Sequence, residues 1–290
     1  MSLPPELAAA VADALGRPVG SATRLGGGDI NEAWQVATSE WPVFVKAHRT
    51  AGLAAFEDEA WGLRWLAEPG SVAVPEVLGV GQVGDGPWAF LALAWVEPGR
   101  PSDHHDERLG RGLAELHAAG APSFGLDRPG TLGSLRLDNT PGPTWPEFFR
   151  TRRLEPLIRA AVDAGAIDPS ARALAARVGD RLVELAGPPE PPARLHGDLW
   201  AGNALVGADG LAVLIDPSAH GGHREVDLAM MDLFGGFGPG VWRAYDERWP
   251  LADGWRDRLA LWQLQPLLVH AVLFGGGYGA SALARLRHVS

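Results

Sequence analysis

The sequence contains no cysteine among its 290 residues. This absence excludes disulfide bonds, thiolate metal sites and a cysteine nucleophile. Lysine is almost absent as well, because Lys46 is the only one and all other permanently charged basic positions are arginine. A single lysine in an arginine-rich chain indicates a position that needs a compact ammonium group.

Acidic residues outnumber basic ones: the sequence has 25 lysine and arginine residues, 35 aspartate and glutamate residues and a net charge of -10. Such a chain is a poor match for a phosphate backbone, so we expect no nucleic-acid partner. The balance does not exclude a nucleotide, because a few local donors and a metal ion are enough to hold its phosphates.

Formal charge is missing from residues 259–284, a stretch long enough to cross a membrane. The stretch also contains polar and helix-breaking residues, namely Gln263, Gln265, Pro266, His270 and four glycines between 275 and 279. A lipid-exposed helix would leave these groups poorly satisfied, so we expect a buried helix and a glycine turn, and no membrane partner. The opening residues MSLPPELAAAVADALG lack the basic segment of a signal peptide and predict a short capped helix. We therefore expect a cytoplasmic protein.

The order of sequence patterns predicts a β-rich first third and a helical remainder. Residues 24–48 read RLGGGD, INEAWQVAT and WPVFVKAH, which predicts strands around a glycine turn, and residues 54–67 have helical spacing. The runs VAVPEVLGVG and PWAFLALAWV predict a second hairpin-like pair. Further on we expect helices over residues 105–119, 145–164, 170–186 and from 225 to the end, with a tight hairpin around 208–210.

This order predicts an α+β, protein-kinase-like fold of two lobes. The first, residues 1–96, is a small β-rich lobe, and the second, residues 97–290, is larger and mainly helical. Ligands usually bind in the cleft between two such units. Polar residues near this division are therefore the first candidates for a functional site.

The strongest local signal is the segment LHGDLWAGNAL, followed by LIDP. Asp198 and Asn203 have the spacing of a kinase catalytic loop, and Asp216 ends the next apolar run. A β-hairpin would return Asp216 toward Asn203, so that both hold one Mg²⁺ while Asp198 faces an acceptor hydroxyl. The alternative is an Asx-turn aspartate and an ordinary hairpin asparagine.

Lys46 ends the strand VFVK, and Glu59 lies on the helix that follows. A kinase lysine in this position binds the ATP phosphates and is held by a helix glutamate. Glu57 is an alternative partner, and a lysine at an exposed strand end is the alternative role. The glycine triplet about twenty residues earlier places backbone amides where they can approach phosphates, although a flexible turn is the simpler interpretation. No Walker A pattern follows it.

Two histidine motifs invite other interpretations. His196 lies two residues before Asp198, and we expect it to brace the loop rather than act as a base. His104 and His105, between two aspartates, look like metal ligands, but a solvated loop and helix N-cap are favoured. Neither a G-x-S-x-G nor an H-E-x-x-H motif is present, so hydrolase and zinc interpretations have little support.

Taken together, these motifs resemble the fructosamine kinase family, which is related to the aminoglycoside and choline kinases. The resemblance runs in order over nearly the whole chain, through GGGDINEAW, VFVKAHR, FEDEAWGLRWL, LGRGLAELHA, LHGDLWAGN, IDPSAHGGHREVDLAMMDLFGGF and FGGGYG. The tryptophan of HGDLW-x-GN and the continuation GGHREVDLAM are its most family-specific parts.

The resemblance implies roles for individual residues. It implies that Asp198 is the catalytic base and that Asn203 and Asp216 bind Mg²⁺. The residues implied to bind ATP are Lys46 with Glu59 at the phosphates, Gly26, Gly27, Gly28 and Asp29 over them, and Leu93, Ala94, Trp95 and Val96 at the adenine. Those implied at the sugar are Trp200, for which a core position is the alternative, and His223.

Other matching positions have structural roles in this interpretation. Asp227 is expected to anchor the catalytic loop, and Phe148, Phe149 and Arg153 to pack the helical lobe. Ala94 stands where relatives usually have glutamate, so adenine recognition would rest on backbone groups. Asp29 stands where some relatives have cysteine, which excludes thiol-based control through that loop.

The expected activity is ATP-dependent phosphorylation of a ketosamine at its 3-hydroxyl, on a free amino acid or a glycated protein lysine. Phosphorylation there makes the adduct labile, which implies deglycation or adduct metabolism, by a monomer or homodimer. Two alternatives stay open: a kinase for another amino sugar, aminoglycoside or amino alcohol, and a non-catalytic nucleotide-binding module.

Overall fold

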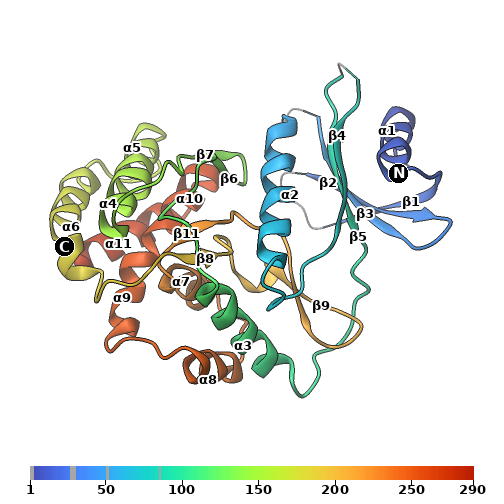
Figure 1. Cartoon of the computed structure of the whole chain (residues 1–290). Coiled ribbons are helices and arrows are strands. Elements are labelled where there is room, and N and C mark those ends of the chain that lie inside the picture. Colours follow the sequence, from blue (N-terminus) through green and yellow to red (C-terminus); the bar gives the residue numbers. More distant parts are fainter. Residues whose placement is uncertain (1–2, 27–30, 50–51, 85) are drawn as a thin grey trace.

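The first third of the chain forms a five-stranded antiparallel sheet in the order β1-β2-β3-β5-β4. The structure, a computed structural model, describes residues 3–26, 31–49, 52–84 and 86–290. The strands are β1 (Val19–Leu25), β2 (Glu32–Thr38), β3 (Val43–His48), β4 (Val77–Gln82) and β5 (Ala89–Ala94). Helices α1 (Pro5–Leu15) and α2 (Leu53–Ala67) lie on opposite sides of this sheet (Figure 1).

Side-chain alternation along β5 explains why both faces of the sheet are covered. Phe90 and Ala92 pack into the cluster that contains Leu7 and Val11 of α1. Their neighbours Ala89, Leu91 and Leu93 pack instead with the apolar side of α2. Successive strand residues point to opposite faces, so a continuous apolar run such as AFLALA needs a helix on each side.

The first helix differs from the expected capped helix. It begins at Pro5, where the missing N–H costs nothing, and Pro4 before it makes no side-chain capping bond. Its end is capped by the backbone, because Gly16 takes the left-handed conformation with φ 64°. Of the two ends of α1, therefore, only the C-terminal end has a capping residue, which is Gly16.

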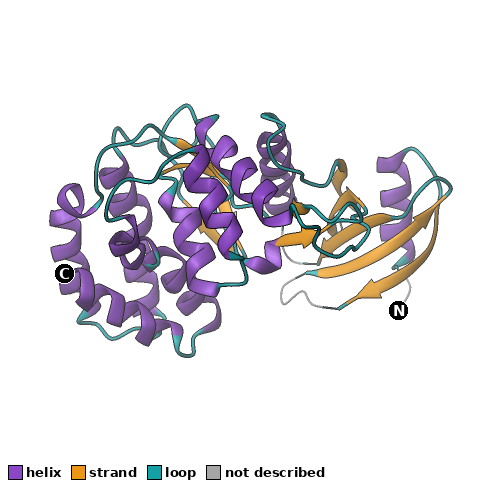
Figure 2. Ribbon diagram, turned by 90° about the horizontal axis from the view of Figure 1, so that it is seen from below, coloured by secondary structure: helices purple, strands orange, loops and turns teal. Residues whose placement is uncertain are grey.

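The rest of the chain is mainly helical and gathers at the end of the molecule away from the five-stranded sheet (Figure 2). Its helices are α3 (His105–Ala118), α4 (Trp145–Phe148), a π-helical segment (Phe149–Leu154), α5 (Glu155–Asp163), α6 (Ala171–Leu185), α7 (Glu225–Phe234), α8 (Pro239–Arg248), α9 (Trp255–Trp262), α10 (Leu264–Phe274) and α11 (Tyr278–Val289). Phe148, Phe149 and Arg153 are buried among them, as expected for packing residues.

Three two-stranded ribbons connect the helices. They are β6 (Gly130–Leu132) with β7 (Leu135–Leu137), β8 (Ala193–Leu195) with β11 (His220–Gly222), and β9 (Ala204–Val206) with β10 (Ala212–Leu214). The β9–β10 hairpin was predicted around residues 208–210, and the structure confirms it. The order of a sheet followed by helices confirms the mixed α+β class, and we keep residues 1–96 and 97–290 as the proposed limits of the lobes.

Two predicted helices are interrupted, and each interruption precedes a proline. Residues 145–164 were expected as one helix but contain the π-helical segment, because Pro156 has no N–H to donate to Arg152. The stretch 259–284 holds parts of three helices, with a break at Gln263 before Pro266. Among the described residues, no helix is both long and apolar enough to cross a membrane.

The start of α3 agrees with the predicted solvated loop and N-cap, since His104 is exposed there. His104 occupies the N-cap position but makes no side-chain capping bond. His105 instead uses Nδ1 to bond the carbonyl oxygen of Gly210 at 3.0 Å, so His105 joins α3 to the turn of the β9–β10 hairpin.

Candidate active site

Lys46 lies at the centre of a charged triangle. Its Nζ donates to both carboxylate oxygens of Glu59, at 3.0 and 2.8 Å, and to Oδ1 of Asp216 at 2.9 Å. Strand alternation places Lys46 on the face of β3 that also bears Phe44, which packs with the α2 cluster. The predicted contact between Lys46 and Glu59 is confirmed, and the alternative Glu57 is an exposed residue of α2.

The ammonium group of this triangle stays charged. Burial alone would lower the pKa of Lys46, but the carboxylates of Glu59 and Asp216 outweigh burial and raise that pKa above its usual range. Partial burial would raise the pKa of Asp216, yet Lys46 holds it below its usual range. The triangle therefore presents one cation between two acidic groups.

Asp216 has an unusual backbone. Its φ of 53° is the only positive value at a non-glycine position in the described part of the chain. Residues with a Cβ reach this left-handed region only at a cost, and such residues cluster at functional sites. The conformation occurs two residues after β10 ends, where the side chain reaches Lys46.

Asp198, Asn203 and Asp216 come together as the sequence predicted. Asn203 Nδ2 donates to the backbone oxygen of Asp198 at 2.8 Å and to its Oδ2 at 3.1 Å. The backbone oxygen of Asn203 accepts from the N–H of Ile215, at 3.0 Å, which brings the residue before Asp216 alongside the loop. The three residues are thus connected in space, and their roles at the metal and the acceptor stay a prediction.

His196 braces this loop from inside. Its Nε2 donates to the carbonyl of Ile215 at 2.9 Å, and its Nδ1 accepts from the N–H of Asp198 at 3.3 Å. A carbonyl oxygen only accepts, so the proton must reside on Nε2. With both ring nitrogens committed and the side chain buried, His196 positions Asp198 and does not act as a base.

Asp227 of α7 anchors the same loop, as predicted. Its two carboxylate oxygens accept from the backbone N–H groups of His196 and Gly197, at 2.7 and 2.9 Å. His117 of α3 lies 3.2 Å from Oδ2. Burial alone would raise the pKa of Asp227, but His117, His196 and the loop amides lower it, so the anchor is ionised.

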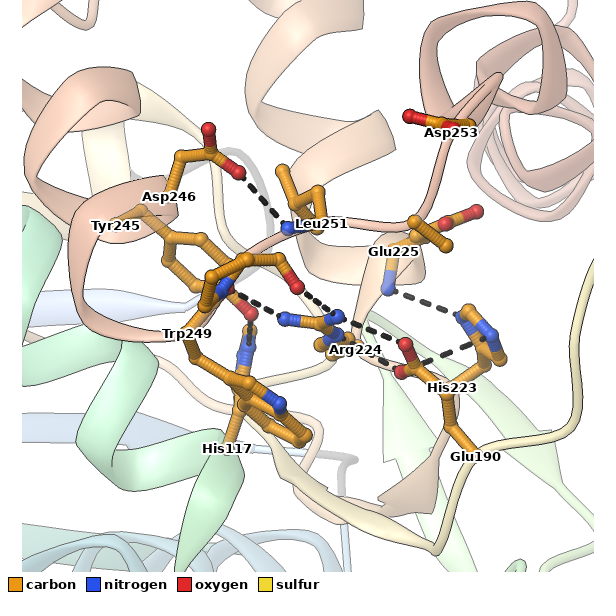
Figure 3. Close-up of polar contacts among 12 residues, drawn as sticks. His117, Glu190, His223, Arg224, Glu225, Tyr245, Asp246, Trp249, Leu251 and Asp253 are labelled. Atoms are coloured by element: carbon orange, nitrogen blue, oxygen red, sulfur yellow. Dashed lines mark hydrogen bonds and ion pairs between the residues drawn. The ribbon is translucent and has the colours of Figure 1, made fainter.

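A second polar network holds the start of α7 in place (Figure 3). Arg224 donates to both carboxylate oxygens of Glu190 at 2.8 Å and to the carbonyls of Trp249 and Pro250. His117 also bonds the hydroxyl of Tyr245, at 2.7 Å. These contacts fix the helix that carries Asp227.

His223 lies in this second network and not at an open surface. It is 3% exposed, its ring stacks on Trp262 with centroids 5.6 Å apart, and its Nε2 lies 3.9 Å from Glu190 (Figure 3). Burial lowers its pKa. This position gives His223 no open edge toward a sugar, so we withdraw it from the expected substrate site.

Asp198 borders a narrow pocket. The pocket is lined by Leu132, Gly197, Asp198, Val226, Met230, Gln265, Pro266 and His270. Burial, helped by the nearby charge of Asp216, raises the pKa of Asp198 to about 7. A carboxylate with such a pKa is suited to accept a proton near neutral pH.

An aromatic row leads from the surface toward this pocket. Trp200 is 42% exposed, and its ring centroid lies 6.3 Å from that of Phe234. The ring centroid of Phe234 lies 5.1 Å from that of His270, which lines the pocket. The alternative of a core position for Trp200 is therefore wrong, and its exposed ring is connected through Phe234 to the pocket residue His270.

The α10 wall of the pocket was not predicted from the sequence. Gln265 and His270 were noted only as evidence against a membrane span. Their signal was present nonetheless, because two polar side chains five residues apart interrupt an otherwise apolar run. Such residues are expected to find partners or to line a site.

The residues expected at the nucleotide are only partly described. Leu93 and Ala94 end β5, and the N–H of Ala94 donates to the carbonyl of Glu76, so that amide is already committed. Trp95 and Val96 are half-buried beyond the strand. Gly26 is exposed after β1, whereas Gly27, Gly28 and Asp29 lie outside the described residues.

The donor set at this loop fits Mg²⁺. Asn203 uses its amide nitrogen on Asp198, which leaves the amide oxygen for a metal, and Asp216 supplies an ionised carboxylate. The described residues include no cluster of three or more His, Cys, Asp or Glu that could hold a metal. Mg²⁺ needs no such cluster, since it is usually bound by one or two carboxylates together with phosphates and water.

The fold and this arrangement define a phosphotransferase of the kinase-like class. A solved aminoglycoside phosphotransferase, in complex with AMP-PNP and hygromycin B, shares the fold with a TM-score of 0.63 at 17% identity, over 98% of this chain and 97% of that one. At this identity the likeness concerns the fold alone.

The chain belongs to the fructosamine kinase family, whose model matches residues 5–289. It is 41% identical to a Thermus thermophilus protein named as a probable ketoamine kinase, over 89% of this chain and 90% of that one. The plant Arabidopsis thaliana has a chloroplastic protein-ribulosamine 3-kinase that is 34% identical, over 90% of this chain and 79% of that one. A crystal structure of a Thermobifida fusca protein assigned as a fructosamine-3-kinase matches with a TM-score of 0.89 and 44% identity, over 98% of both chains.

Proposed function

We propose that this protein transfers the γ-phosphoryl group of ATP to the 3-hydroxyl of a ketosamine. The observation that carries the proposal is Asp198, which borders a pocket on a loop shared with Asn203 and tied to the Lys46–Asp216 ion pair. A carboxylate beside an acceptor pocket, together with a lysine and metal-binding oxygens, is the set that phosphoryl transfer requires. The names of the relatives support a ketosamine as the acceptor.

In this mechanism Lys46 binds the ATP phosphates and Glu59 keeps its ammonium group in place. Asn203 and Asp216 hold Mg²⁺, which when bound neutralises charge on the phosphates. Asp198 orients the acceptor hydroxyl and accepts its proton, so that the oxygen attacks phosphorus as the bond to ADP breaks. His196 and Asp227 keep that carboxylate in position.

The exposed ring of Trp200 is the proposed platform for the acceptor. An indole face suits the C–H face of a sugar, and its place next to Phe234 directs a bound adduct toward Asp198. An adduct on a free amino acid and one on a glycated protein lysine both fit this arrangement. Removal of such adducts, in the cytoplasm and by a monomer or homodimer, is the proposed role.

The first test is ADP release by the purified protein with Mg-ATP, with and without fructoselysine. Acceptor-dependent ADP and a product heavier by one phosphoryl group in mass spectrometry would support the proposal. ADP release with a different amino sugar or amino alcohol alone would move the substrate class. ATP binding without turnover on any acceptor would favour a non-catalytic nucleotide-binding module.

A further inference from the structure

Gln265 of α10 is a buried side chain with an unsatisfied hydrogen-bond acceptor. It is 2% exposed, it lines the pocket beside Asp198, and its Oε1 has no partner among the described residues. A buried amide oxygen without a donor carries a free-energy cost, so native structures usually supply a partner. The pocket has a volume of about 10 Å³, so it admits a single group of the size of a hydroxyl or an amine, and one such group of a ligand could supply that donor.

Gln263, two residues earlier, shows what a structural glutamine looks like in this chain. It is equally buried, but its Nε2 donates to Asp232 at 2.9 Å and its Oε1 accepts from Arg285 at 3.0 Å. Its amide is thus satisfied within the protein at both ends. The contrast indicates that the free acceptor of Gln265 is not a general feature of buried amides here.

The other polar groups of the pocket are acceptors too. His270 Nδ1 donates to the carbonyl oxygen of Pro266 at 2.8 Å, which leaves Nε2 of the neutral ring with a lone pair. Asp198 adds a carboxylate, and the remaining side chains of the lining are apolar. Because the pocket offers acceptors, it suits a molecule that brings O–H or N–H donors, as a polyol or an amine does.

We propose that Gln265 is a specificity-determining residue, whose Oε1 accepts a hydrogen bond from a hydroxyl or amine group of the phosphoryl acceptor. The inference rests on the proposed function, since it takes the pocket beside Asp198 to be the place where the acceptor binds. According to this inference, α10 as well as the catalytic loop contacts the acceptor and contributes to its selection. The hydroxyl or amine group of the acceptor loses its hydrogen bonds to water when it enters the narrow pocket. Without Gln265 Oε1 it would remain unpaired there.

The test compares Gln265→Met and Gln265→Leu with Gln263→Met, using the acceptor that the wild type phosphorylates best. Both Gln265 variants should raise the acceptor KM about tenfold, with the ATP KM unchanged and Tm equal to or above that of the wild type. Gln263→Met should instead lower Tm without a selective effect on the acceptor KM. Deoxy and N-acylated acceptor analogues complete the cycle, because one of them lacks the donor that Gln265 recognises. The wild type should bind that analogue about tenfold more weakly than it binds the parent acceptor. The Gln265 variants should bind the analogue and the parent acceptor equally well.

Two results would overturn this inference. One is an unchanged acceptor KM in soluble Gln265 variants, and the other is a lower Tm with both KM values raised together, as expected of a packing residue. Failure of the proposed function is a separate outcome, since it appears as a wild type that phosphorylates no ketosamine. In that case the same variants are measured with whichever acceptor is turned over.

Discussion

Asp198 is held where its charge is costly to the folded protein. Burial and the neighbouring Asp216 raise its pKa to about 7, whereas the pKa of an exposed aspartate is about 3.9. The folded chain therefore binds this proton more tightly than the unfolded chain. Its free energy of unfolding must fall as pH rises from about 4 to about 7, because over this interval the unfolded state has released the proton and the folded state has not.

Asp198→Asn should separate activity from stability. Turnover should drop by at least about 100-fold, because the variant cannot accept the acceptor proton. The ligand-free variant should be more stable than the wild type by on the order of 1–2 kcal/mol at pH 8, with a smaller gain at pH 5. Chemical denaturation at both pH values measures this difference. A variant that is active, or equally stabilised at pH 5 and pH 8, would contradict the assignment.

Lys46 forms ion pairs with two carboxylates. Two substitutions, one that removes its charge and one that keeps it, separate the effect of the charge from that of the side-chain shape. Lys46→Met leaves Glu59 and Asp216 without their cation and should cost roughly 2–3 kcal/mol of unfolding free energy, in addition to nucleotide affinity. Lys46→Arg keeps the charge and should retain most of the stability. Its planar guanidinium does not reproduce the ammonium contacts, so turnover should still fall at least about tenfold. Denaturation curves and ATP titrations measure the two effects separately.

Helix α2 connects the proposed nucleotide side of the site to the helical part of the chain. Glu59 faces Lys46, while its neighbour Asp58 accepts hydrogen bonds from Arg128 at 3.1 Å and from Arg136 at 2.9 Å. Thr131 of β6 also donates to Asp58, at 3.1 Å. Two adjacent residues of one helix thus contact the sheet and the distant ribbon, and the position of Glu59 depends on both.

Asp58→Asn should therefore weaken catalysis without any contact with the reactants. We expect a twofold to tenfold loss in kcat/KM for ATP, because the helix loses its charged contacts to Arg128 and Arg136. Glu57→Gln is the matched control, since it removes the same charge from an exposed position of the same helix. Steady-state kinetics on both variants measures the effect. Equal losses in the two would point to net charge, and no loss in either would show that Asp58 does not position Glu59.

Helices and strands could be predicted from the sequence where local patterns were unambiguous. The residues at which helices end or break could not. The pattern of α2 and the turn of the β9–β10 hairpin were recognised because apolar spacing and the Ala-Asp-Gly turn are local signals. The breaks before Pro156 and Pro266 were missed, although each proline removes one helical donor. Proline within the first turn of a helix is well tolerated, so its presence alone does not say whether a helix bends or starts anew.

The candidate site was predictable as a set of residues but not as a surface. Spacing and motif brought Asp198, Asn203 and Asp216 together, since a loop and a hairpin are local structures. His223 was misplaced because motif proximity does not reveal which way a side chain points, and its ring is buried against Trp262. Gln265 was overlooked because its approach to the loop of Asp198 depends on the packing of a helix distant in sequence.

In the molecule as a whole, the two parts are joined by an apolar cluster, in which Trp65 and Leu66 of α2 pack with Leu113 of α3, and by ion pairs. Lys46 belongs to the sheet and Asp216 to the helical part, and their ion pair crosses between them. Asp58 provides a second crossing through its arginine partners. Because the Lys46–Asp216 pair belongs to the proposed phosphate site and joins both parts, occupation of that site should stabilise the whole chain and not one part of it.

Mg-ATP should therefore raise the thermal midpoint in a single transition, and only when both components are present. At a concentration of about 100 times Kd the gain is about 2.7 kcal/mol, which for a chain of this size corresponds to roughly 5 °C in Tm. EDTA should abolish most of the shift, because Asn203 and Asp216 contribute through the metal. Asp216→Asn should show a small shift with or without EDTA, which separates the metal site from general nucleotide binding. A shift that survives EDTA in the wild type would mean that the phosphates are held by Lys46 and backbone groups alone, and the proposed metal ligands would have to be abandoned.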